Sequence, residues 1–255
     1  MTGGTHPGTR GPAAPAVERQ DSLIGIIKLA EENYRRRGEL TVRSSWAEKL
    51  ECLEDAGNSY EIQWRLSRAL FLDGEQNPEL YATGALQGLR AVKINSDRVE
   101  GHFWTGVNLA LYAQARKGPK GAVALLKSRG ELKRACAISE AYHGAGPLRV
   151  LGRLEHKSPR LLGGSLARSS SYYERALAIA PTNTVTLVYA AELAMDRREY
   201  ERAASLLETA IRLPIDPDWE FENIRDKNQA ESMLRRLPPV WTARVEAAPD
   251  GQRGS

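Results

Sequence analysis

The stretch that decides the fold covers residues 173–213 and reads YERALAIAPTNTVTLVYAAELAMDRREYERAASLLETAIRL. Four positions in it recur after a step of 34 residues with side chains of similar character. The matched pairs are Tyr173 and Leu207, Ala176 and Ala210, Leu177 and Ile211, and Ile179 and Leu213. A fixed period of about 20 to 50 residues is typical of stacked repeat architectures. The sequence therefore predicts a chain built from repeating structural units.

Each unit is predicted to be a pair of amphipathic helices. Helix 184–195 is followed by the short polar link 196–199, so the next helix must fold back antiparallel to it. That next helix carries one apolar stripe at helical spacing, formed by Tyr200, Ala203, Ala204, Leu207, Ala210 and Ile211. One hairpin cannot bury such a stripe alone, but a stack of hairpins can. A 34-residue period with an Ala-rich helical face is that of the tetratricopeptide (TPR) repeat.

The rest of the chain extends this pattern in both directions. We expect further helices at about 22–37, 44–55, 62–71, 78–94, 99–116, 122–139 and 148–156, one that ends at Ala180, and one that begins at Pro217. The predicted fold is an all-α, TPR-like superhelix of about five antiparallel helical hairpins with a C-terminal capping helix. It spans residues 22–237, between a disordered N-terminal tail (1–21) and a flexible C-terminal tail (238–255).

The repeat period is longer in the middle of the chain. The pattern Ala-x-x-Ile recurs at steps of 44 and then 41 residues, at Ala91–Ile94, Ala135–Ile138 and Ala176–Ile179. Relative to a period of 34, the extra residues fall at 117–127 and 156–165. Insertions in repeat proteins map to loops on one face, often the binding face. We therefore expect loops with a functional role at both places.

Composition limits the class of protein. Charged residues make up 27% of the 255 residues and hydrophobic residues 42%, which is ordinary for a soluble globular chain. No apolar run reaches about 18 residues, so no membrane span is expected. Residues 1–20 lack the apolar core of an export signal, which favours a cytoplasmic location. The two cysteines, Cys52 and Cys136, are expected to be buried free thiols.

Several short motifs, in one order along the chain, resemble a known family. They are Trp64-Arg65-Leu66-Ser67-Arg68, Glu100-Gly101-His102-Phe103-Trp104, Gly146-Pro147-Leu148-Arg149-Val150-Leu151-Gly152, Ser158-Pro159 and Trp219-Glu220-x-Glu222-x3-Asp226-Lys227. Over about residues 23–237 the chain resembles the bacterial TPR proteins grouped as the T-component of tripartite ATP-independent periplasmic (TRAP) transporters. It is similar, more loosely, to the regulator of microtubule dynamics family of eukaryotes.

These resemblances imply different partners. The T-component family implies oligomers assembled around a pore and docking of a periplasmic solute-binding protein. The microtubule family implies binding to microtubules. T-component proteins are exported, whereas residues 1–20 favour the cytoplasm.

Positive charge is concentrated in residues 116–175. This segment contains 13 Lys or Arg and four acidic residues, so its net charge is +9 while that of the whole chain is +4. A basic surface of this kind suits an acidic protein partner or another anion. Nucleic acid is an unlikely partner, because aromatic residues are not interleaved with the cations as a base-stacking surface requires. The alternative is that the segment forms only a solvated outer face.

One predicted helix, 148–156, carries the candidate binding site of this segment. The candidate residues are Arg149, Arg153, His156, Lys157 and Arg160, of which the first four share one helical face. Four such groups would repel one another unless an anion or carboxylates lay against them. The alternative to a ligand-facing role is neutralisation within the protein by partners such as Glu155 or Glu174.

No catalytic residue, cofactor or metal site is predicted. A histidine within a repeat helix, such as His102, is more often structural than catalytic. Ser169 to Ser171 together with His143 or His156 lack the Gly-x-Ser-x-Gly elbow and the strand that a hydrolase triad needs. No phosphate loop, His-Glu-x-x-His helix, calcium loop or Cys-x-x-Cys pair occurs. The tryptophans that fit apolar stripes, interpreted as core or inter-repeat packing, are Trp46, Trp64, Trp104 and Trp219.

The sequence therefore favours a non-enzymatic TPR scaffold. It would bind another protein or an extended peptide, with an acidic surface or segment, through the basic face in residues 116–175. The alternative is a transport-accessory or small-ligand-binding protein that encloses a solute between its helices. A homo-oligomer is a further expectation, because insertions in a solenoid can serve an oligomer contact.

Overall fold

The computed structural model describes residues 16–39 and 58–238, with side chains from residue 23 onward. All regular elements in these ranges are helical. The α-helices are α1 (Ala16–Arg35), α4 (Tyr60–Asp73), α5 (Glu79–Ile94), α6 (Val99–Ala115), α7 (Pro119–Ile138), α8 (Tyr142–Lys157), α9 (Leu166–Ile179), α10 (Thr184–Asp196), α11 (Tyr200–Arg212) and α12 (Glu220–Leu234). Two 3-10 turns, η2 (Arg160–Leu162) and η3 (Pro217–Trp219), lie in the links. The predicted all-α, TPR-like fold is confirmed.

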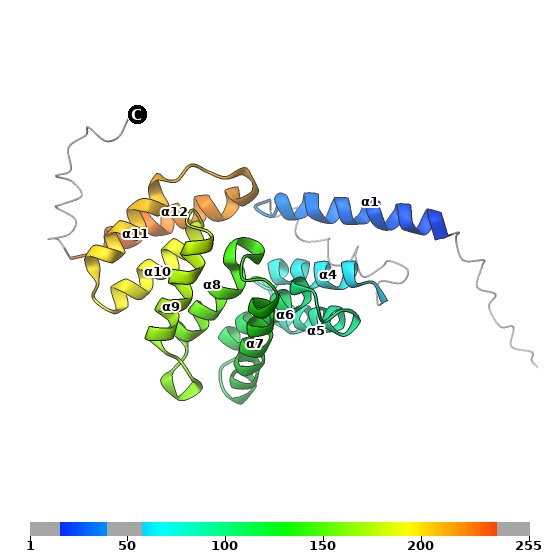
Figure 1. The fold of residues 1–255 in the computed structure, drawn as a ribbon, viewed down its shortest axis with the longest axis horizontal. Helices are drawn as coiled ribbons and strands as arrows, with labels where there is room; N and C mark the ends of the chain where they lie inside the picture. The colour runs from blue at the N-terminus through cyan, green and yellow to red at the C-terminus, as the bar shows by residue number, and fades with distance from the viewer. Residues whose placement is uncertain (1–15, 40–57, 239–255) are drawn as a thin grey trace, which may run out of the picture.

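Successive helices from α4 to α11 form antiparallel hairpins that stack into a curved array (Figure 1). The repeated alanines Ala91, Ala135, Ala176 and Ala210 are completely buried. An alanine there lets the neighbouring helix approach closely, since its side chain ends at Cβ. Helix α12 packs on α10 and α11 as the predicted cap, burying Ala230, Met233 and Leu237.

In each of three hairpins, a serine hydroxyl of one helix donates a hydrogen bond to the backbone carbonyl of a glycine in the other helix. Ser67 of α4 donates to the carbonyl of Gly84 in α5 at 2.7 Å, and Ser128 of α7 donates to that of Gly106 in α6 at 2.7 Å. Ser169 of α9 donates to that of Gly152 in α8 at 2.8 Å. The three serines are completely buried. At Gly106 and Gly152 the missing side chain also lets the partner helix of the hairpin come close, because an added Cβ would lie 2.6 Å from Leu132 or Tyr173.

The first insertion lengthens helices and does not form a loop. Helices α6 and α7 have 17 and 20 residues, whereas α10 and α11 have 13 each. Only Arg116–Gly118 joins α6 to α7, because Pro119 starts the next helix at a position where its missing N–H costs nothing. The loop expected at 117–127 is therefore wrong. The second insertion, 156–165, is a link that contains the 3-10 turn η2.

Helix α8 begins earlier than the predicted 148–156. It contains three consecutive residues with left-handed backbone, His143 (φ 55°), Gly144 (φ 61°) and Ala145 (φ 57°), before Pro147. Residues 143–145 thus form a tight left-handed turn that is continuous with the helix. Two of the three residues are not glycine, and such residues rarely adopt this conformation.

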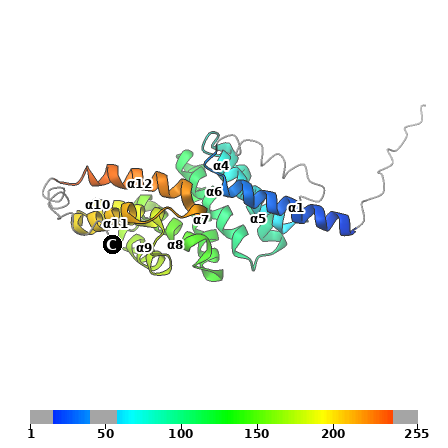
Figure 2. The ribbon, with the colours of Figure 1, turned by 90° about the horizontal axis from the view of Figure 1, so that it is seen from above.

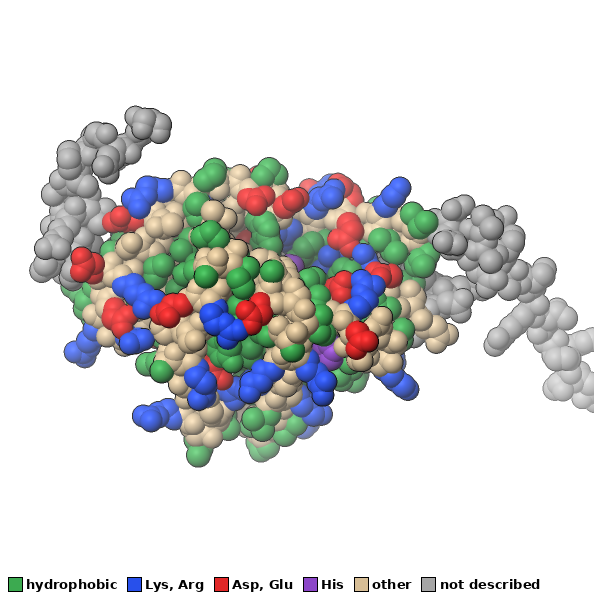
Figure 3. All heavy atoms as spheres, viewed as in Figure 1, with side chains coloured by type: hydrophobic (Ala, Val, Ile, Leu, Met, Phe, Trp, Pro, Cys, Tyr) green, Lys and Arg blue, Asp and Glu red, His purple; other side chains and the backbone are tan. Residues whose placement is uncertain are grey.

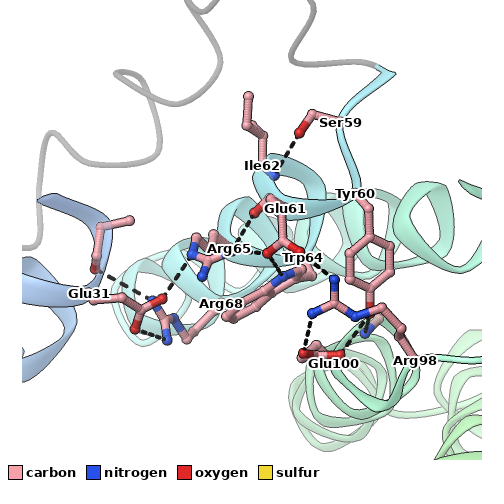
Figure 4. A network of polar contacts seen from close by, with 12 residues as sticks. Glu31, Ser59, Tyr60, Glu61, Ile62, Trp64, Arg65, Arg68, Arg98 and Glu100 are labelled. Atoms are coloured by element: carbon pink, nitrogen blue, oxygen red, sulfur yellow. Dashed lines mark hydrogen bonds and ion pairs between the residues drawn. The ribbon is translucent and has the colours of Figure 1, made fainter. Parts of the chain in front are cut away.

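Helix α1 closes the open side of the arc, lying roughly end to end with α12 across the stack (Figure 2). Glu31 of α1 forms ion pairs with Arg65 (2.8 Å) and Arg68 (3.0 Å) of α4 (Figure 4). Just beyond the helix, Arg37 forms an ion pair with Glu222 of α12. Helix α1 starts at Ala16 instead of the predicted residue 22, while the predicted helix 44–55, Trp46 and Cys52 lie outside the described residues.

Candidate binding cleft

A cleft of about 980 Å³ runs along the inner side of the arc. The first helices of successive hairpins, α4, α6, α8 and α10, supply much of its wall, and α1, η3 and α12 add further residues. The elongated ends of α6 and α7 and the link after α8 form its outer part through Arg116, Lys117, Gly121, Ser158 and Pro159. Both insertions therefore border the same cleft.

The inner part of the cleft is an aromatic cluster centred on His143. Ring centroids of Tyr34, Phe103, Trp104, Tyr142 and Trp219 lie 4.8–6.2 Å from that of His143. These rings come from α1, α6, α8 and the 3-10 turn η3. The left-handed turn places His143 among them. Aromatic walls of this kind are typical of ligand pockets.

His143 has one ring nitrogen bonded and one free. The Tyr34 hydroxyl forms a hydrogen bond of 2.8 Å with Nε2, and burial raises the pKa of Tyr34 to about 12, so the phenol keeps its proton. Burial, followed by the charges of Arg149, Arg68 and Arg37, holds the pKa of His143 well below its usual value. The imidazole is therefore neutral, and its Nδ1 is buried with no hydrogen-bond partner among the described residues.

Arg149 is the most buried cation of the cleft wall, with 5% of its surface exposed. Its guanidinium donates to the carbonyls of Gly144 (2.7 Å) and His143 (3.3 Å) and to Asn183 Oδ1 (3.3 Å). Burial lowers the pKa of Arg149. No carboxylate of the described chain forms an ion pair with it. The residue thus holds the left-handed turn in place, and its positive charge lies beside the aromatic cluster without a direct ion pair among the described residues.

The other predicted site residues are neutralised by α10 or lie apart. Arg153 pairs with Glu192 at 2.5 Å. Lys157 pairs with Glu192 at 2.5 Å and with Asp196 at 3.6 Å. His156, which is buried outside the cleft wall, lies 2.7 Å from Asp196 through Nε2. Arg160 is exposed in η2. Arg149, Arg153 and Lys157 line the cleft together.

The carboxylates expected to neutralise this face serve other cations. Glu155 is buried between Arg129 (3.2 Å) and Arg168 (2.7 Å). Glu174 pairs with Arg202 at 3.0 Å. Glu192 and Asp196 lie 39 and 40 residues further along the chain than Arg153 and His156, on the next hairpin. That separation is about one repeat, so the pairing follows from the stacking of hairpins.

Sequence reasoning missed several residues of the cleft and misplaced one. Tyr34, Tyr189 and His143 were not assigned to a site, although all three line the cleft. Trp64 and Trp104 are buried as expected, but Trp219 is only partly buried and forms part of the cleft wall. The motifs quoted above were the available signal, because Phe103, Trp104, Arg149, Trp219 and Glu222 all belong to them and all line the cleft.

The groups most suited to catalysis have structural roles. His102 is buried between Glu131 (Nδ1 to Oε2, 2.6 Å) and the carbonyl of Ser96 (3.0 Å). Burial raises the pKa of the Cys136 thiol to about 11, which leaves it protonated. Across residues 23–39 and 58–238, His, Cys, Asp and Glu side chains do not gather in threes that could hold a metal. Within the described ranges no helix is long and apolar enough to cross a bilayer.

Comparison with known proteins supports both fold and family. A solved structure of PilF from Pseudomonas aeruginosa is similar with a TM-score of 0.53 and 17% sequence identity, covering 91% of this chain and 100% of that one. At this identity the likeness concerns the fold alone. No curated protein matches the sequence significantly. The family profile of the TRAP transporter T-component matches residues 66–239, which is more than half of the chain. The chain therefore belongs to the TRAP transporter T-component family.

Proposed function

We propose that this chain is a non-catalytic binding protein that holds an organic anion with an apolar or aromatic body in its cleft. The observation that carries the proposal is Arg149, a buried guanidinium without a carboxylate partner beside an aromatic wall. Leaving a buried charge unpaired is costly. A bound carboxylate, sulfonate or phosphate would supply the missing negative charge, and the free Nδ1 of His143 would supply a second polar contact.

The other charges of the cleft leave Arg149 as the inner anion site. Four other cations of the wall already have carboxylate partners, in the pairs Arg116–Glu79, Arg153–Glu192, Lys157–Glu192 and Arg225–Asp226. The cleft-lining carboxylate of Glu222 forms an ion pair with Arg37. The anionic group of a ligand would thus find two cations without an ion pair among the described residues, Arg149 in the inner part of the cleft and Lys117 in its outer part.

The size of the cleft suits a small molecule. Ligand pockets usually measure about 300–1,000 Å³ and combine apolar walls with few polar groups. The cleft of about 980 Å³ lies at the upper end of this range, so it has room for an elongated ligand. This favours the solute-binding alternative over capture of a protein by the face of α8, where Arg153, His156 and Lys157 already have acidic partners.

A protein-binding scaffold is a second candidate. It is favoured by exposed cations outside the face of α8, above all Lys117, Lys120, Lys127 and Arg160, which could meet an acidic protein surface. Membership of a transporter-component family adds an accessory role in solute transport to this candidate. The two roles are compatible, because the cations lie at the outer part of the cleft and beyond it.

Two matched fluorescent probes test the cleft proposal. 1-Anilinonaphthalene-8-sulfonate is an aromatic anion, and N-phenyl-1-naphthylamine is its uncharged counterpart. We expect the anion to bind more tightly, and Arg149→Gln to weaken its binding about tenfold while the uncharged probe changes little. Arg149→Lys is the control that keeps the charge, and circular dichroism checks that the helices persist. Equal affinity of the two probes for the wild type and for Arg149→Gln would contradict the proposal.

A further inference from the structure

We infer that the edge formed by residues 116–127 and 157–168 docks onto the surface of an anionic lipid bilayer. This interaction surface, here called the basic edge, is distinct from ligand binding within the cleft. Both segments project at the same end of the molecule, where the link between α6 and α7 lies beside the link between α8 and α9 (Figure 1). Arg129 of α7 bonds to the carbonyl of Leu162 in η2, so the two segments are held together.

The basic edge carries an excess of positive charge. The sequence has no Asp or Glu from residue 101 to 130, nor from 156 to 173. The exposed cations of this edge that form no ion pair among the described residues are Lys117, Lys120, Lys127 and Arg160. In Figure 3, Lys and Arg side chains gather along the lower edge of the molecule, whereas most acidic side chains lie above it. Each such cation adds attraction to an anionic membrane surface.

An exposed leucine stands among these cations. Leu161 is 95% exposed, whereas its neighbour Leu162 turns inward and packs against the core. The turn that carries Leu161 is fixed by backbone hydrogen bonds from Leu162 and Gly164 to the carbonyl of Pro159 and from Gly163 to that of Arg160. Leu166, 43% exposed, follows as the first residue of α9. The apolar side chain is therefore held outward by the fold of the turn.

This combination fits a bilayer surface better than an acidic protein. A single leucine on a projecting turn can enter the layer just below the lipid phosphates, while long Lys and Arg side chains bond to the phosphates around it. A protein partner would need both a pocket for Leu161 and a ring of carboxylates in matching positions. An anionic lipid surface offers an apolar layer for Leu161 and phosphates for the cations at every point. The basic edge therefore needs no partner with a matching shape.

Vesicle sedimentation with the full chain tests this inference. The probes are vesicles of phosphatidylcholine alone and of phosphatidylcholine mixed with phosphatidylglycerol. We expect binding to the mixed vesicles that declines with salt, and no binding to phosphatidylcholine alone. Lys117→Glu, Lys120→Glu and Arg160→Glu combined should weaken partitioning by at least about a hundredfold, from about one kcal/mol for each cation. Leu161→Glu should weaken it as well.

A charge-matched variant separates the basic edge from a general effect of net charge. Lys93→Glu, Arg212→Glu and Arg235→Glu change the same number of exposed cations on α5, α11 and the end of α12, and this variant should retain most of the binding. Equal losses in the two triple variants would overturn the inference. An absence of binding to the mixed vesicles would also overturn the inference. If the chain then bound polyglutamate through the same cations, the partner would be an acidic protein.

Discussion

At the scale of the residue, the left-handed turn at 143–145 is the most unusual local feature of the chain. His143 and Ala145 adopt positive φ without being glycine, which costs roughly 1–2 kcal/mol for each residue. Arg149 offsets this cost by donating to the carbonyls of His143 and Gly144. The turn in return keeps the imidazole inside the aromatic cluster. Such conformations concentrate at functional sites, which agrees with the position of the turn in the cleft wall.

The neutral state of His143 makes stability depend on pH. Because its folded-state pKa lies well below the ordinary value of 6.5, the unfolded chain binds more protons below about that pH. The contribution of His143 is therefore present above pH 6.5 and is lost as the pH falls below it. His143→Asn, which cannot titrate and tolerates positive φ, should lose less free energy of unfolding between about pH 7.5 and pH 5.5 than the wild type does. Urea denaturation at the two pH values measures this difference.

His102 provides a control of opposite sign. Its pKa is raised, first by the hydrogen bond to Glu131, so its contribution is present below pH 6.5 and is lost as the pH rises through the folded-state pKa. His102→Asn should therefore make the loss of stability in acid steeper. A wild-type pH dependence in His143→Asn would show that the imidazole is not held neutral in the folded state.

At the scale of the element, the hairpins depend on close helix contacts at glycine. A Cβ added to Gly152 of α8 would lie 2.6 Å from Cε1 of Tyr173, a ring that is only 1% exposed. Such contacts are too short to persist, and a buried ring has little room to move. At Gly152, therefore, a methyl group cannot be added without separating α8 from α9.

Gly152→Ala should destabilise the protein by about 1–3 kcal/mol, because the added methyl overpacks the α8–α9 contact. Gly130→Ala in α7 is the matched control. No atom lies within 4 Å of the Cβ position there, so the higher helix propensity of alanine should stabilise the protein by about 0.5–1 kcal/mol. Urea unfolding of both variants measures the difference, and effects of the same sign would contradict the packing described for α8 and α9.

These elements also show which features the sequence could predict. The 34-residue period and the apolar stripes predicted α10 and α11 closely, because burial in a stack imposes that periodicity. The left-handed turn escaped prediction, since three consecutive residues with positive φ are rare and Ala145 gives no signal for that conformation. Charge spacing identified Arg149 as a candidate, but not its aromatic surroundings. Tyr34 and His143 are 109 residues apart, and only the closure of the arc by α1 brings them together.

At the scale of the whole molecule, α1 connects the two ends of the arc. Through Glu31 it is tied to α4, and through Arg37 to α12 (Figure 4 shows the first of these contacts). The guanidinium of Arg37 also lies 4.6 Å from the ring of Tyr34 and 5.7 Å from that of Trp219. The cleft is thus completed by residues from both termini of the described fold, and its shape depends on the pair Arg37–Glu222.

Glu222→Gln tests this dependence. The side chain of Arg37 is 2% exposed and that of Glu222 13%, so loss of the carboxylate leaves a buried guanidinium undercompensated. We expect the free energy of unfolding to fall by about 2–3 kcal/mol. Hydrogen exchange should become faster in α1 and the start of α12, while α10 and α11 keep their protection. Affinity for the anilinonaphthalene probe should also fall, because Tyr34 and Trp219 lose their fixed positions.

Glu32→Gln is the control, since its pair with Arg35 is exposed on both sides and should contribute less than about 0.5 kcal/mol. Unchanged exchange in α1 of Glu222→Gln would mean that contacts with α4 alone hold this helix in place, and that the cleft does not need a closed arc.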